Sequence, residues 1–124
     1  MSPGSIPLGK TMFRIREAAD IVGVKPYVLR FWETQFAWIQ PERDTSGQRR
    51  YTRRNLEDIL VIRSMLREER YTIAGVRQML VEARRTGHLE DLRKPQRAVL
   101  KQHDDRMMLL NLKKELQRLL KRVQ

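Results

Sequence analysis

Apolar residues recur at helical spacing in four stretches within residues 15–87. The first stretch runs from Ile15 to Gly23, and glycine commonly ends a helix. The second begins at Pro26, which suits the first turn of a helix because its missing N–H needs no partner there. Thr52 and Thr72 suit the N-cap positions of two further helices, the last of which is expected to bury Ile73, Val76, Met79, Leu80 and Ala83. The pattern therefore predicts four helices, the first two joined as a helix-turn-helix.

Helical spacing is lost between the second and third helices. Trp38-Ile39 and Arg50-Tyr51 flank a polar segment with Gly47 near its centre, a pattern typical of a β-hairpin. Positive charge is concentrated here, because a single acid, Asp44, accompanies the five arginines of residues 43–54: Arg43, Arg49, Arg50, Arg53 and Arg54. Guanidinium groups on a short hairpin can grip a phosphate backbone, so this segment is expected to be a DNA-binding wing.

Beyond Gly87 the apolar pattern changes to a heptad repeat. Spacings of 3, 4, 3 and 4 residues separate Leu109, Leu112, Leu116, Leu119 and Val123, which we call the leucine seam. Two interpretations are open: the helix folds back onto its own domain, or two chains pair through the seam. Pairing is favoured, because a long leucine seam exposed to water is unfavourable for a single chain.

The composition limits the classes of partner and chemistry. In 124 residues there are 26 Lys+Arg against 15 Asp+Glu, a net charge of +11, which indicates a polyanionic partner. The chain has no cysteine, and its two histidines lack carboxylates at ligand spacing, so neither a metal nor another cofactor is expected. No nucleophile–base pair or glycine-rich phosphate loop is present, so an enzyme is not expected. The sequence lacks a membrane-spanning stretch and a signal-peptide core, which predicts a cytoplasmic location.

The length supports one modest domain with an appended helix. Residues 1–12, which include Pro3, Gly4, Pro7 and Gly9, are expected to be a flexible leader. Residues 13–87 are expected to be the DNA-binding domain. Residues 88–124 are expected to form a coiled-coil dimerisation helix.

Two runs of adjacent residues, Leu29-Arg-Phe-Trp-Glu33 and Gly47-Gln-Arg-Arg-Tyr51, lie in the predicted second helix and in the predicted wing. Through these runs, residues 13–85 resemble the MerR family of bacterial transcription regulators, whose members carry a Leu-Arg-Tyr-Tyr-Glu-like run and a Gly-Tyr-Arg-x-Tyr-like wing at the same places. The stretch Tyr71-Thr-Ile-Ala-Gly-Val76 is similar to the start of the family's fourth helix. The resemblance implies a mainly α fold: a winged helix-turn-helix of four helices with a small β-hairpin wing, followed by a long dimerisation helix. The chain resembles a short form of the family, expected to have no effector domain, so no metal, redox or drug input is expected within it.

The resemblance and the charge pattern together predict the DNA-binding residues Arg16, Lys25, Tyr27, Arg30, Trp32, Arg43, Gln48, Arg49, Arg50 and Arg53. Arg30 stands where the family's recognition helix presents an arginine to DNA, although it could instead pair with Glu33 or Glu17. Tyr27 replaces a frequent arginine, so a bidentate contact to guanine is not available there. Trp32 could pack in the core or donate its indole N–H to a phosphate. Phe31 lacks a hydroxyl, which makes core packing at least as plausible for it.

These inferences predict a sequence-specific, double-stranded DNA-binding transcription regulator of the nucleoid that binds an inverted-repeat operator as a homodimer. Activating members of the family bend and untwist promoter DNA for RNA polymerase, which makes the polymerase a further candidate partner. The alternative is an architectural or excisionase-like protein that bends DNA without controlling a promoter.

Overall fold

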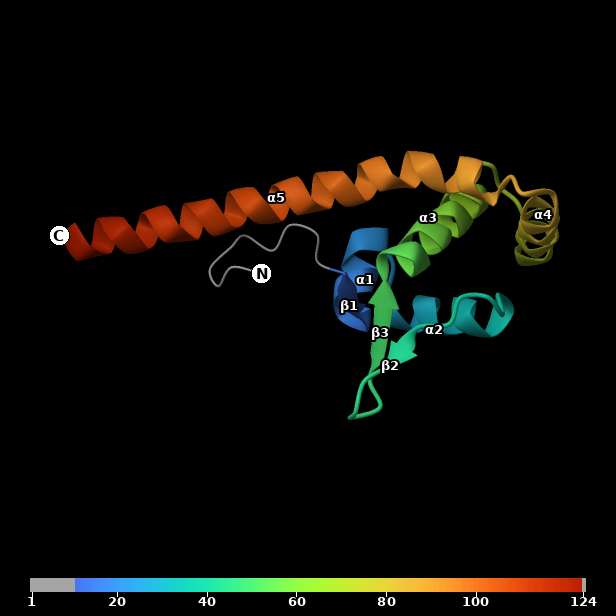
Figure 1. Cartoon of the computed structure of the whole chain (residues 1–124), viewed down its shortest axis with the longest axis horizontal. Coiled ribbons are helices and arrows are strands. Elements are labelled where there is room, and N and C mark those ends of the chain that lie inside the picture. Colours follow the sequence, from blue (N-terminus) through green and yellow to red (C-terminus); the bar gives the residue numbers. More distant parts are fainter. Residues whose placement is uncertain (1–10, 124) are drawn as a thin grey trace.

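The computed structural model describes residues 11–123, except for the side chain of Val123. In chain order the elements are β1 (Met12–Arg14), α1 (Ile15–Val22), α2 (Pro26–Gln35), β2 (Glu42–Arg43), β3 (Arg49–Thr52), α3 (Arg53–Arg67), α4 (Ile73–Thr86) and α5 (Leu89–Val123). The predicted mainly α fold with a small wing and a long final helix is confirmed (Figure 1). Of the flexible leader predicted at residues 1–12, residues 1–10 lie outside the described residues. Met12 already belongs to β1.

The helix ends coincide with the predicted residues. Gly23 ends α1 in the left-handed region with φ near +80°, where a side chain would be strained. Pro26 opens α2, as its preference for the first turn predicts. The hydroxyls of Thr52 and Thr72 each accept a backbone N–H three residues later at 3.0 Å, so both threonines are N-caps.

The small sheet has one strand that the sequence pattern did not predict. Strand β3 lies at its centre, paired antiparallel with β2 on one side and with β1 on the other. Three residues are too short for an alternation of apolar and polar positions to be recognised, which explains why β1 was missed. The wing, residues 42–52, is also shorter than predicted: Trp38 and Ile39 precede it, and Ile39 is buried in the core.

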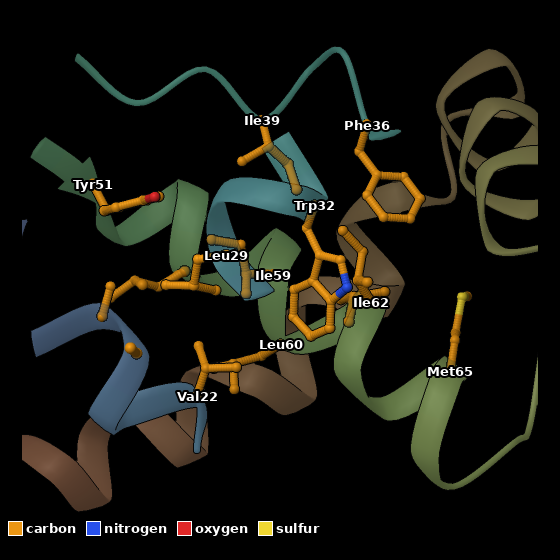
Figure 2. Close-up of a cluster of buried hydrophobic side chains, with 14 of the residues drawn as sticks. Val22, Leu29, Trp32, Phe36, Ile39, Tyr51, Ile59, Leu60, Ile62 and Met65 are labelled. Carbon is orange, nitrogen blue, oxygen red and sulfur yellow. The ribbon is translucent and has the colours of Figure 1, made fainter. Parts of the chain in front are cut away.

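The hydrophobic core lies between α1, α2 and α3. Figure 2 shows Leu29 and Trp32 of α2 close to Ile59, Leu60 and Ile62 of α3. Tyr51 of β3 and Phe13 of β1 are also fully buried, so the sheet belongs to the same core. The expectation for α4 was partly wrong, because Met79 is 44% exposed while Val76, Leu80 and Ala83 are buried.

The first half of α5 packs on α3. Leu100 is buried, and Leu89 and Leu92 are packed against the core. Two carboxylates of α3, those of Glu57 and Asp58, are also almost completely buried. Buried charges need partners, and α5 supplies them. Three ion pairs join the two helices: Arg53–Asp104 at 2.8 Å, Arg93–Asp58 at 2.6 Å and Arg97–Glu57 at 3.3 Å.

The second half of α5 extends beyond the other described elements (Figure 1). The four leucines of the seam are between 46% and 66% exposed, namely Leu109, Leu112, Leu116 and Leu119. The side chain of Val123, the fifth seam residue, lies outside the described residues. The interpretation in which this helix folds back onto its own domain is therefore wrong, because the described part of the seam contacts no part of the core.

Breaking the most buried ion pair should destabilise the fold. Arg93→Met keeps much of the aliphatic stem but leaves the Asp58 carboxylate buried without its cation, and we expect the free energy of unfolding to fall by about 3 kcal/mol. Urea denaturation measures this loss. As a control, Arg85→Met removes an arginine from an exposed ion pair on α4 and should leave stability nearly unchanged. Equal stability of the two variants would show that the Arg93–Asp58 pair does not anchor α5.

Candidate nucleic-acid interface

A cationic groove of about 540 Å³ lies between the start of α1, the outer side of α2 and the turn of the wing. We call it the arginine groove. Its lining includes four arginines, Gln48 and one glutamate; the arginines are Arg14, Arg16, Arg30 and Arg49. The fold thus brings together Arg16, Arg30, Gln48 and Arg49, which were predicted from three separate segments. Arg14 was missed, because it belongs to the unpredicted strand β1.

The outer side of α2 carries polar and aromatic groups. With 3.6 residues per turn, Tyr27, Arg30, Phe31 and Thr34 fall on one side of this helix, and all four are exposed. Tyr27 is 68% exposed and Phe31 is 50% exposed. Of the roles that the sequence left open for Phe31, core packing is therefore contradicted by the structure.

The opposite side of α2 supports the core. Trp32 is only 6% exposed and lies among the buried side chains in Figure 2. An indole so enclosed cannot reach a phosphate oxygen while the domain stays folded. Of its two predicted roles, the structure favours packing over DNA contact, and Trp32 is left out of the interface that we propose.

The turn of the wing is organised by one carboxylate. Asp44 accepts hydrogen bonds from the hydroxyl and backbone N–H of Ser46 and from the backbone N–H of Gln48, at 2.6, 2.9 and 2.9 Å. These hydrogen bonds, that of the Ser46 hydroxyl foremost, lower the pKa of Asp44 below its ordinary value. The bonds therefore hold the turn at neutral pH and weaken only in acid, as the pH falls through the lowered pKa. Arg50, predicted to contact DNA, pairs with the same carboxylate at 2.7 Å.

A second carboxylate fastens the wing to α2. Glu33 of α2 accepts hydrogen bonds from the Nε of Arg49 at 2.8 and 3.1 Å and from the hydroxyl of Tyr51 at 3.0 Å. Burial, and then the neighbouring carboxylate, raise the pKa of Tyr51 well above its ordinary value, so the phenol remains a proton donor. Arg49 thus lines the groove and also positions the wing. Glu33 was predicted only as a possible partner of Arg30, and its positioning role was missed.

The remaining predicted residues are distributed around the groove. Lys25 is exposed at the N-cap of α2. Arg43 is exposed on the wing, where one of its guanidinium nitrogens donates to the carbonyl oxygen of Gly47 at 2.8 Å. Arg53 is held elsewhere: it pairs with Asp104 of α5 and its guanidinium lies 5.6 Å from the centre of the Phe13 ring. Arg53 therefore ties α5 to the domain and does not line the groove.

Residues 11–123 contain neither a metal-binding cluster nor a membrane-spanning helix. No group of three or more acidic, histidine or cysteine side chains in that range is placed to hold a metal ion. None of the described helices combines the length and apolar character that crossing a membrane requires. Among the described residues, the arginine groove gathers four arginines, and the outer side of α2 beside it is exposed.

Comparison with known proteins identifies the family of the chain. A family model described as MerR HTH family regulatory protein matches residues 13–83, more than half of the chain. The matched range contains every residue that lines the arginine groove. Helix α5 lies after this range. No curated protein matches the chain.

Removing the carboxylate of Glu33 should loosen the wing. Glu33→Ala deprives Arg49 and Tyr51 of their acceptor, and we expect a loss of about 2 kcal/mol in the free energy of unfolding, as for other hydrogen bonds to charged groups. Tyr51→Phe alone should cost about 1 kcal/mol, and the double variant should lose less than the sum, because both changes act on the same carboxylate.

Chemical denaturation of the three variants measures these losses. Glu42→Ala, which removes an exposed carboxylate from the wing, is the matched control and should be neutral. Additive losses in the double variant would mean that Tyr51 does not donate to Glu33 in solution.

Proposed function

Because the chain belongs to the MerR helix-turn-helix family of regulatory proteins, we propose that this DNA-binding transcription regulator acts as a homodimer on an inverted-repeat operator. Each protomer places α2 in a major groove and holds the flanking phosphates with its arginine groove and wing. The observation that carries the proposal is the meeting of Arg16, Arg30 and Arg49 beside the exposed side of α2. Phosphate contacts there would set the position of the helix, and its outer side chains would read base edges.

The exposed leucine seam supports the homodimer. Four leucines, each about half exposed or more, follow heptad spacing on a helix that extends away from its own domain. A second copy of α5 offers a matching apolar surface, and burying it would remove these side chains from water. A two-fold axis through the paired helices relates the two recognition helices, so the operator would have the same symmetry.

The ion pairs between α3 and α5 bear on the spacing of the half-sites. Since α5 is anchored to the DNA-binding domain through Asp58, Glu57 and Asp104, the seam and the recognition helix form one unit. The distance between the two recognition helices in the dimer would then be set by the protein. We therefore expect one preferred spacing between half-sites.

Selection of bound sequences from a random pool of DNA duplexes tests the proposed function. We expect an enriched inverted repeat with a fixed central spacing. In vitro transcription from a promoter that contains it, by RNA polymerase with and without the protein, then gives the sign of regulation. Enriched sites at recombination loci without an effect on transcription would instead support an architectural, DNA-bending role. Salt-dependent binding without any enriched sequence would contradict the operator.

Charges placed in the seam should separate the protomers. Leu112→Glu together with Leu116→Glu puts carboxylates at two core positions, and we expect monomers in analytical ultracentrifugation with much weaker operator binding. Asn111→Glu with Gln117→Glu adds the same charge outside the seam and should leave the dimer intact. If the Leu112 and Leu116 variant remains a dimer, the protomers do not pair through the seam.

A further inference from the structure

Two aromatic side chains on the recognition helix lie outside the hydrophobic core. Tyr27 and Phe31 lie one helical turn apart and are 68% and 50% exposed. The core receives Leu29 and Trp32 from the other side of the same helix. Large apolar groups exposed in this way, as neighbours on one surface, often mark a place that a partner covers.

The charges around this aromatic pair identify the class of partner. Arg30 lies on the same side of α2, and it also lines the arginine groove with Arg14 and Arg16. Lys25 is exposed at the first turn of the helix. An apolar pair bordered by cations fits a polyanion that also presents apolar groups, and duplex DNA is such a ligand.

The major groove offers few apolar groups. The C5-methyl group of thymine is the apolar group on its base edges, and side chains that cannot form hydrogen bonds with bases can still contact it. Phe31 has no hydrogen-bonding group at all, and Tyr27 lacks the guanidinium fork that would read guanine. This pair is therefore better suited to thymine than to guanine.

On the basis of the proposed function, we propose that Tyr27 and Phe31 read thymine methyl groups in each operator half-site. Arg30, on the same side of α2, supplies the adjacent polar contact to a base edge or phosphate. Packing of the same rings on deoxyribose would also bury them, but it would give no preference for thymine. The two modes of contact can be separated by removing only the methyl group.

The test uses the selected operator and replaces each thymine of the half-site in turn by deoxyuridine, which keeps the pairing with adenine. Fluorescence anisotropy with the full chain measures the affinity. We expect about fourfold weaker binding for each half-site methyl group that the aromatic pair contacts, because the burial of one methyl group is lost. Thymines elsewhere in the operator should tolerate the change.

Variants then show which side chain contacts the methyl group. The Phe31→Ala or Tyr27→Ala variant should bind the thymine operator and the deoxyuridine operator with equal affinity, because the methyl group has lost its partner. Both residues are exposed, so the variants should fold, which circular dichroism verifies. Val81→Ala removes another exposed apolar side chain, 54% exposed on α4, and should keep the fourfold difference.

Each outcome is decisive. If the wild-type protein binds every deoxyuridine operator as well as the thymine operator, or if the difference persists in both alanine variants, the inference is overturned while the regulator itself stands. If the selection yields no operator, the proposed function fails first, and the inference fails with it.

Discussion

Two acidic side chains that α3 buries, Glu57 and Asp58, determine how the rest of the molecule is joined. A buried carboxylate without a cation is strongly destabilising, so each acid requires an arginine from a neighbouring element. Arg97 and Arg93 of α5 meet this requirement. The final helix is therefore anchored along its first half and leaves the domain in a defined direction (Figure 1). Any partner that binds its second half is placed relative to the recognition helix by the same contacts.

The positive charge of the chain is less available to a ligand than its net value suggests. Arg49, Arg50 and Arg53 all belong to the arginine-rich segment, yet each pairs with an acid of the same chain. Arg49 still lines the groove, whereas Arg50 braces the wing turn and Arg53 holds α5. Composition counts charges, but ion pairing within the fold decides which of them face a polyanion. The exposed Arg16 and Arg30 are better placed for that purpose.

Neighbouring residues of α2 have opposite roles. Trp32 fills the core and Phe31 faces outward, because successive residues of a helix point about 100° apart. Residue type did not distinguish them, since both are large aromatic groups. Their positions around the helix relative to the buried Leu29 distinguished them. Helix α2 thus has one side that stabilises the domain and another that is exposed, as the proposed base contacts require.

Local chemistry in the sequence determined the helix ends, the turn at Gly23 and the caps at Thr52 and Thr72, because these depend on residues within one turn of each other. It also determined the family, through motifs of adjacent residues. Only the tertiary structure decided that residues 12–14 form a strand, that Glu33 holds the wing, and that α5 is anchored on α3. These features join residues that are 16 to 51 positions apart, and no periodicity along the chain shows which of many possible acids and arginines will meet.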